Sequence, residues 1–243
     1  MLRLRPLAAF MLAIPLLACA AGTADNTDSV RQAFEKKFPQ RQVQAVRATP
    51  VTGIYEIVLP DRQVVYADAK VKHLFVGDLI DVDARQSLTE ARVAELSKVD
   101  WKNLPLDLAF KEVRGNGSRK LAVFSDPDCP FCKRLERDSL KGVTNVTIYT
   151  FLYPLTSLHP DAMHKSAQIL CSSNPQAAWS DFMLNDKPLA GDGKCAAADK
   201  LASIQQLAEK LGISGTPALV FPNGQLVSGA IPKTDVEKLL NSK

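Results

Sequence analysis

The spacing of hydrophobic and polar positions in the first half of the chain changes near residue 42. Residues 28–38 place apolar side chains three to four positions apart with charges between them, which predicts an amphipathic helix that Pro39 ends. Between residues 42 and 83, short β-branched or aromatic runs alternate with turn residues, which indicates a small meander of strands. The runs are QVQAVRAT, GIYEIVLP, RQVVYADA and HLFVGDLIDV. Residues 25–85 are therefore predicted to form a small α+β domain.

The segment SLTEARVAELSKVDWKNLP follows the meander and has the pattern of a helix. Ser87 and Glu90 stand in capping-box spacing, and the pattern ends at Pro105. We expect a helix from Ser87 to about Asn103. Residues 86–105 would then link the first domain to the rest of the chain.

Strand and helix patterns alternate from residue 120 to the C-terminus. A strand, a helix from Cys129 to about Lys141 and a second strand come first, and a helix-rich stretch fills residues 159–211. Two further strands and a closing helix follow, with Thr234 and Glu237 in capping-box spacing. This order predicts an α/β layer architecture for residues 106–243, with 159–211 as a helical insertion. The strand sequences are KLAVFS, VTIYTFLY, ALVF and QLVS.

The first 24 residues have the layout of a secretory signal peptide. Arg3 and Arg5 precede a short apolar run, and small residues follow it. No later stretch approaches the roughly 20 apolar residues that a transmembrane helix needs, so we expect an exported, soluble protein. Cleavage after Ala20 or Ala24 is expected, and a lipoprotein-type cut before Cys19 is the alternative.

Loss of this segment changes the composition in two ways. The net charge falls from +4 to +2, which argues against a nucleic-acid partner. Four of the five cysteines remain, an even number in a compartment where disulfides persist. These are Cys129, Cys132, Cys171 and Cys195.

The stretch DPDCPFCKRL holds two of these cysteines in C-x-x-C spacing, which fits a zinc site, a structural disulfide or a redox dithiol. A structural zinc site needs four ligands, and neither a second C-x-x-C nor matching histidines accompany the motif. We read His73, His159 and His164 as surface or packing residues. A two-residue loop is rarely used as a structural disulfide. A redox dithiol without metal or other cofactor is the favoured interpretation.

Cys129 follows a buried-looking strand and stands at the first turn of a predicted helix, with Pro130 where a missing N–H costs nothing. Unpaired N–H groups and the positive helix end stabilise a thiolate there and lower the thiol pKa. We therefore expect Cys129 to be the exposed, low-pKa thiol. Cys132, one turn later, would resolve mixed disulfides.

Charged neighbours of the dithiol act in both directions. Lys133 and Arg134 are expected to stabilise the thiolate, whereas Asp126 and Asp128 are expected to destabilise it.

A second motif, GISGTPALVFPNGQLVSG, follows a predicted helix and leads into a hairpin. With VFSDPDCPFCKRL and the N-terminal meander containing VVY, it resembles the bacterial periplasmic disulfide isomerases of the DsbC and DsbG type, which have a thioredoxin fold. The resemblance implies that Cys129 attacks, that Cys132 resolves, and that Thr216-Pro217 forms a cis-prolyl loop facing the dithiol and binding substrate. By residues alone, an ordinary trans turn is the expected state of Pro217, because cis is a minority state for X-Pro bonds; only the resemblance favours cis.

The same resemblance implies a structural disulfide between Cys171 and Cys195, with a second active dithiol as the rival interpretation. The Pro130-Phe131 dipeptide is closer to the DsbG pattern, whereas the Ser-Gly-Thr-Pro loop and the second cysteine pair resemble DsbC.

The expected protein is a periplasmic homodimer that rearranges incorrect disulfides in misfolded exported proteins and has some chaperone capacity. Residues 25–85 are too few for a convincing core, so we expect them to pair with their own copy and bury Ile54, Ile57 and Val65 more fully. The resemblance implies a membrane thiol reductase of the DsbD type as electron donor. A dithiol oxidase and a non-enzymatic holdase are the alternatives.

Overall fold

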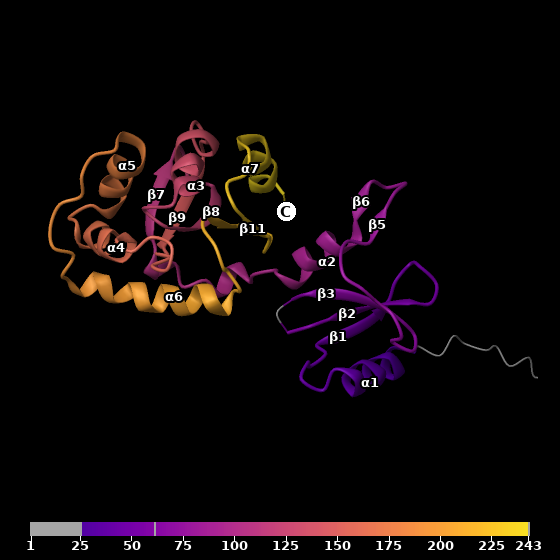
Figure 1. Ribbon diagram of the computed structural model, residues 1–243. Helices are drawn as coiled ribbons and strands as arrows, with labels where there is room; N and C mark the ends of the chain where they lie inside the picture. Colours follow the sequence, from indigo (N-terminus) through magenta and orange to yellow (C-terminus); the bar gives the residue numbers. More distant parts are fainter. Residues whose placement is uncertain (1–25, 61, 243) are drawn as a thin grey trace, which may run out of the picture. The chain divides into compact units, whose positions relative to one another are not determined.

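The computed structural model describes residues 26–60 and 62–242. The chain divides into two units (Figure 1). The first contains the described residues up to Leu59 together with Val65–Phe75, and the second contains Pro60–Val64 and the chain from Val76 onward. The expected signal peptide and Cys19 lie outside the described residues.

The N-terminal unit packs one helix against a four-stranded sheet with the order β1-β2-β3-β4. Val30 and Phe34 of the helix are buried against Ile57 and Val65 of the sheet. Ile57 is 0% and Val65 5% exposed in a single chain, so the expectation that pairing would bury these two further was wrong. Ile54 is half-buried, and its further burial by pairing stays a prediction. The elements are α1 (Thr27–Lys37), β1 (Ala45–Ala48), β2 (Ile54–Val58), β3 (Val64–Asp68) and β4 (Leu74–Phe75).

The fourth predicted strand is broken into two short strands. Gly77, with φ +142°, separates β4 from β5 (Ile80–Asp81), which pairs instead with β6 (Gln86–Ser87). This segment exposes apolar side chains at five positions: Leu74, Phe75, Val76, Ile80 and Val82.

The linker helix is shorter than expected. The Ser87 hydroxyl accepts the Glu90 N–H at 3.0 Å, as the capping box predicts, and begins α2 (Leu88–Leu96). The helix ends at Leu96 and does not reach Asn103. A separate 3-10 turn follows, and the Asp100 carboxylate caps it by accepting the Lys102 N–H. The 3-10 turns span Trp101–Asn103 and Leu106–Leu108.

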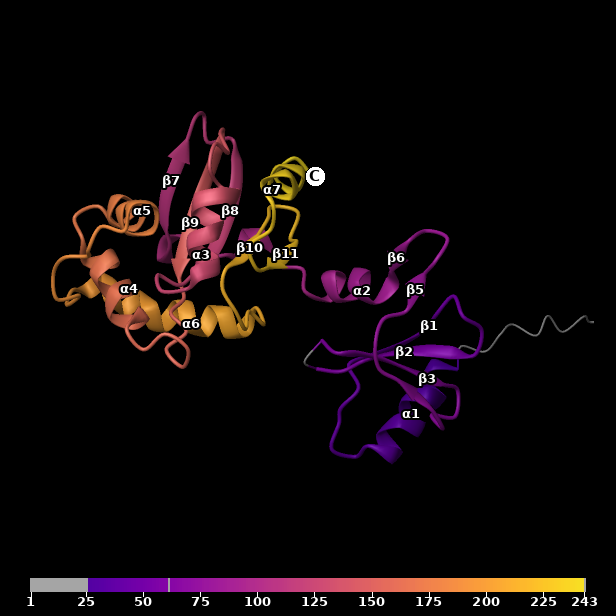
Figure 2. The same cartoon turned by 45° about the horizontal axis from the view of Figure 1, so that its top comes forward.

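The C-terminal unit is built on a five-stranded sheet with the order β11-β10-β8-β9-β7 (Figure 2). The two central strands, β8 and β9, run parallel, and the other pairs are antiparallel. The strands are β7 (Phe110–Arg114), β8 (Arg119–Ser125), β9 (Val146–Leu152), β10 (Ala218–Val220) and β11 (Leu226–Ser228).

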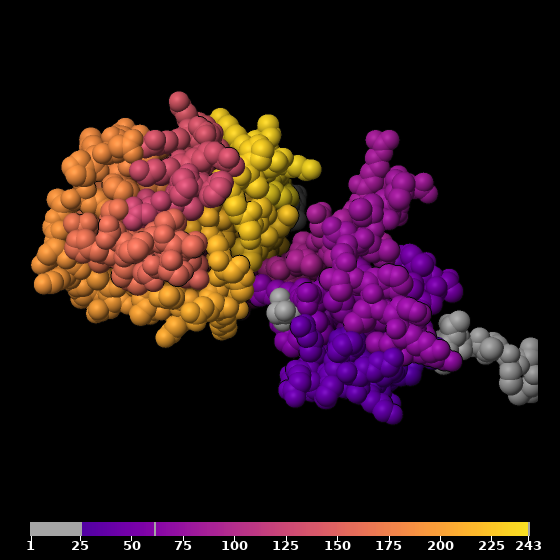
Figure 3. Space-filling model, viewed as in Figure 1, coloured from indigo at the N-terminus to yellow at the C-terminus, as the bar shows by residue number. Residues whose placement is uncertain are grey.

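Alternating side chains of β8 build a core on each face of this sheet. Leu121 and Val123 join the cluster formed with α7 (Lys233–Leu240) and with Leu135 and Leu140, which follow α3 (Pro130–Arg134). Phe124 joins the cluster of α6 (Lys200–Lys210) on the other face. The insertion adds α4 (Ala162–Cys171), α5 (Pro175–Asn185) and a 3-10 turn at Ala196–Asp199. It forms the orange surface of this unit in Figure 3.

Three local expectations fail in this unit. The helix after Cys129 becomes a π-helix over Leu135–Ser139, where the Leu140 N–H reaches back to Leu135 O. Strand β7 was not predicted at all. Helix α7 begins directly after Pro232, so Thr234 lies inside the helix and does not cap it.

Candidate active site

The two cysteines of the C-x-x-C motif lie where β8 ends and α3 begins. Cys129 is the N-cap residue of α3, and Pro130 occupies the first helical position, as the sequence indicates. Cys132 is 0% exposed, and Cys129 is only 4% exposed, so the expected exposed thiol is in fact nearly covered. Phe131, between them, is 55% exposed and is the prominent apolar side chain beside the dithiol.

The Cys129 thiol has the lowered pKa that a nucleophile needs. The hydrogen bond from the Cys132 thiol lowers the pKa of Cys129 to about 5, more strongly than burial raises it. Thr216 and the backbone N–H groups of Cys132 and Phe131 act in the same direction. The start of α3 therefore stabilises the thiolate form of Cys129.

Cys132 has the opposite character. Burial, reinforced by the neighbouring Cys129 thiolate, raises the pKa of the Cys132 thiol far above its ordinary value. Its sulfur accepts the backbone N–H of Asp126 at 3.4 Å, which holds it against the end of β8. At neutral pH the pair therefore consists of one thiolate and one thiol.

The Thr216-Pro217 peptide bond is cis and lies directly against the dithiol. Cys129 Sγ is 3.4 Å from the Thr216 carbonyl oxygen, to which the thiol form donates. Pro217 immediately precedes β10, which pairs with β8, so neighbouring strands carry the loop and the dithiol to the same end of the sheet.

The charged neighbours of the dithiol are arranged differently from the expectation. Lys133 bonds to Asp186 at 3.1 Å, and the Arg134 guanidinium lies 5.5 Å from the centre of the Phe131 ring. Asp128 is paired with Lys165 at 2.5 Å. The thiolate therefore depends mainly on the Cys132 thiol and on the backbone N–H groups of Cys132 and Phe131, because these side-chain charges are engaged elsewhere.

His159, interpreted from the sequence as a surface or packing residue, lies beside the dithiol. Its Nδ1 is 3.0 Å from Oδ2 of Asp126, whose side chain is fully buried. The sequence gives no signal for this pairing, because 33 positions separate the two residues.

A buried carboxyl group, Glu136, was also missed. Trp179 Nε1 donates to it at 3.0 Å, and Arg114 lies 4.0 Å away. Burial raises the pKa of Glu136, and the Trp179 hydrogen bond partly offsets this. Trp179 belongs to the same buried cluster as Cys129 and Cys132.

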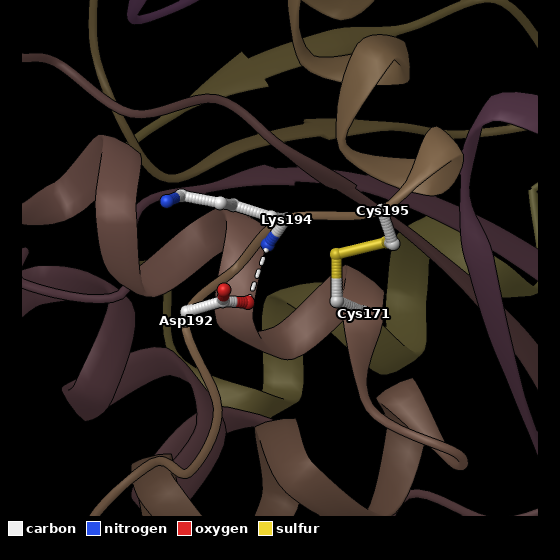
Figure 4. The surroundings of a disulfide bond; sticks show 4 residues. All are labelled: Cys171, Asp192, Lys194 and Cys195. Atoms are coloured by element: carbon white, nitrogen blue, oxygen red, sulfur yellow. Dashed lines mark hydrogen bonds between the residues drawn. A yellow bond between two sulfur atoms is a disulfide. The ribbon is translucent and has the colours of Figure 1, made fainter.

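Cys171 and Cys195 are joined by a disulfide between the end of α4 and the turn before α6 (Figure 4). The loop that it closes turns at Asp192, whose carboxylate accepts the Lys194 N–H at 3.0 Å. In residues 26–60 and 62–242, His, Cys, Asp and Glu side chains form no group of three or more that could hold a metal ion.

Two family models match the chain. Residues 106–243 match the thioredoxin-like domain, and residues 19–90 match the disulfide bond isomerase protein N-terminal domain. The probable thiol:disulfide interchange protein DsbC of Bordetella pertussis is 40% identical over 216 residues, which cover 88% of this chain and 74% of the relative. The thiol:disulfide interchange protein DsbC of Escherichia coli K12 is 26% identical over 96% of this chain and 94% of its own.

A solved disulfide interchange protein from Neisseria gonorrhoeae is 43% identical, with a TM-score of 0.50 over 56% of this chain and 96% of that one. Among residues 26–60 and 62–242, no helix is long and apolar enough to cross a membrane. The expected α+β architecture with a thioredoxin-like C-terminal domain is confirmed. The chain belongs to the DsbC family of thiol:disulfide interchange proteins and is an enzyme of thiol–disulfide interchange.

Proposed function

We propose that this enzyme is a disulfide isomerase and that Cys129 is its attacking thiol. The Cys129 thiolate attacks one sulfur of a wrong disulfide, the substrate S–S bond breaks, and the other substrate sulfur leaves as a thiolate. A mixed disulfide then joins Cys129 to the substrate. The observation that carries this assignment is the contrast between Cys129, with a pKa lowered to about 5, and the buried Cys132, whose pKa is raised.

The buried thiol of Cys132 favours isomerisation over simple reduction. Cys132 must lose its proton before it can attack Cys129 Sγ and release a reduced substrate, and burial opposes that loss. The substrate thiolate therefore has time to attack another cysteine of its own chain. When the last exchange expels Cys129, the enzyme returns to its starting thiolate with no net electron transfer.

The cis-prolyl loop is proposed as the substrate-binding element. The Thr216 carbonyl lies beside Cys129 Sγ, and an extended peptide would pair with backbone groups of this loop. The exposed Phe131 ring would provide apolar contact on the other side of the sulfur. The disulfide between Cys171 and Cys195 would stabilise the insertion without taking part in exchange.

We also propose that residues 25–85 form a dimerisation domain that precedes the linker, and that the chain acts as a periplasmic homodimer. The apolar side chains exposed over residues 74–82 support this, because they lie on very short strands that a second copy would cover. A membrane thiol reductase of the DsbD type would keep Cys129 and Cys132 reduced. The substrates would be misfolded, disulfide-containing exported proteins, and some chaperone capacity would accompany the isomerase.

Recovery of activity from a secreted ribonuclease with scrambled disulfides tests this function. The reduced enzyme should restore ribonuclease activity, and Cys129→Ala should abolish the recovery. A protein that oxidises reduced ribonuclease rapidly but leaves the scrambled form unchanged is a dithiol oxidase. Equal protection against aggregation by wild type and Cys129→Ala, without recovery by either, identifies a holdase. Either result would reject the proposed isomerase.

A further inference from the structure

His159 has a position next to the dithiol that the proposed exchange chemistry does not use. Its imidazole comes from the segment between β9 and α4, and its side chain is 21% exposed. Nδ1 contacts the fully buried carboxyl group of Asp126 at 3.0 Å. The other ring nitrogen, Nε2, makes no hydrogen bond to any of the described residues and remains free to take a proton.

Asp126 connects this histidine to both sulfurs. Its backbone N–H donates to Cys132 Sγ at 3.4 Å, and its backbone carbonyl accepts the Cys129 N–H at 3.2 Å. The carboxylate also accepts the N–H groups of Asp128 at 2.8 Å and Leu155 at 2.7 Å. Because this carboxyl group already accepts from two backbone donors, we assign Nδ1 of His159 as a third donor.

The negative charges around His159 favour its protonated form. Asp126, Cys129 and Asp128 are the negative groups that face it, and Lys165 is bonded to Asp128. The hydrogen bond to Asp126 raises the pKa of His159, burial opposes this, and the charges of Asp126, Cys129 and Asp128 add to the rise. The contribution from Cys129 exists only while that sulfur carries a negative charge.

We propose that His159 is a positioning residue that takes up a proton when the dithiol is reduced and thereby stabilises the Cys129 thiolate. The inference rests on the proposed role of Cys129. In the reduction, a dithiol reductant supplies two electrons and the Cys129–Cys132 bond breaks. Cys132 Sγ takes one proton, Cys129 Sγ keeps the negative charge, and Nε2 of His159 takes a second proton from solvent.

The proposal requires a reciprocal effect. If a protonated His159 favours the reduced state, the reduced state must favour a protonated His159 by the same factor. Oxidation joins the two sulfurs and removes the negative charge, so the pKa of His159 must be higher in the reduced enzyme than in the oxidised enzyme.

Proton NMR titration of the histidine rings in the full-length protein measures this directly. His164, which is exposed on the next helix, is the internal control, and His159→Gln assigns the signals. We expect the His159 midpoint to fall by about half a pH unit or more on oxidation, a change of about threefold in its proton affinity. The His164 midpoint should stay constant. Equal His159 midpoints in the two redox states would overturn the proposal, as would a shift shared by His164.

Alkylation of Cys129 gives a second test that separates this inference from the proposed function. His159→Gln should decrease the alkylation rate at pH 5 by about twofold, because a rise of about half a unit from a pKa of about 5 lowers the thiolate fraction of Cys129 from about one half to about one quarter. His159→Arg, which keeps a cation, and His164→Gln should match wild type. An unchanged rate in His159→Gln refutes the role of His159 and leaves Cys129 as the nucleophile. If wild-type Cys129 does not react at mildly acidic pH at all, the assignment of Cys129 itself fails.

Discussion

Removal of the disulfide between Cys171 and Cys195 should destabilise the thioredoxin-like domain without stopping thiol exchange. The two cysteines are 24 positions apart, so the bond closes a loop of 25 residues in the unfolded chain. In the chain-entropy model, a loop of that length corresponds to roughly 3.5 kcal/mol of stability. For a domain of this size, the change lowers the melting temperature by about 10 °C. Neither cysteine is fully buried, so the lost packing of two sulfur atoms adds little.

Urea unfolding followed by tryptophan fluorescence is the suitable assay. The protein has two tryptophans, Trp101 and Trp179, and both belong to the C-terminal unit. Their fluorescence therefore follows the unfolding of that unit and not of the N-terminal unit. The reference protein is Cys129→Ala/Cys132→Ala, which lacks the other dithiol. Its free energy of unfolding is compared with that of the same protein carrying Cys171→Ala/Cys195→Ala in addition. Ser173→Ala/Lys194→Ala, which changes exposed neighbours and keeps the bond, is the matched control.

Two results would refute this reasoning. If removal of the bond lowers the free energy of unfolding by less than about 1 kcal/mol, and the urea dependence is unchanged, the bond does not constrain the unfolded chain as proposed. Loss of isomerase activity in the otherwise wild-type enzyme, without loss of stability, would show that Cys171 and Cys195 take part in exchange.

Three further predictions concern the resolving thiol, the buried carboxyl group and assembly. Cys132→Ala should accumulate mixed disulfides with substrate, seen as bands that disappear on reduction, and their absence would reject Cys132 as the resolving thiol. Because burial raises the pKa of Glu136, the folded state keeps a proton that the unfolded chain loses; the free energy of unfolding should fall as pH rises above 4.5. In urea unfolding between pH 4 and 8, Glu136→Gln should reduce this dependence of the free energy of unfolding on pH, whereas Glu209→Gln, at an exposed position, should not. The same pH dependence in wild type and Glu136→Gln would contradict the argument. In sedimentation at micromolar concentration, the wild type should be a dimer and Val76→Glu/Ile80→Glu a monomer. Val113→Glu is the control, because Val113 in β7 is about as exposed as Ile80, and this variant should stay dimeric. A monomeric wild type would reject the proposed dimer.

The sequence predicted elements well where the pattern of burial is simple. Strands β8 and β9 are almost continuous apolar runs, and both were predicted within about one residue of their ends. Strand β7 was missed because three of the five residues in its sequence, FKEVR, are charged and because it lies at the edge of the sheet, where Val113 is exposed. The π-helix after Arg134 was missed because nothing in helical periodicity marks a widened turn.

In the candidate site, the residues of a local motif could be predicted, and those that depend on contacts between distant parts of the chain could not. Cys129 and Cys132 share a local motif at a strand-to-helix junction, so their neighbourhood and the lowered thiol pKa of Cys129 could be predicted from a few adjacent residues. His159 and Glu136 are hydrogen-bonded to partners that lie 33 and 43 positions away in the chain. Contacts of that range depend on how α4 and α5 pack on the sheet, which a single sequence does not show.

Selective alkylation of the reduced protein at pH 6 tests the central claim, that Cys129 is the nucleophile of this enzyme. A thiol with a pKa of about 5 is about nine-tenths thiolate at that pH, whereas an ordinary cysteine is well below one-tenth. A short reaction with iodoacetamide, followed by peptide mass spectrometry, should show Cys129 modified and Cys132 unmodified. Modification of Cys132 before Cys129, or no modification of either until the pH exceeds about 8, would contradict the account.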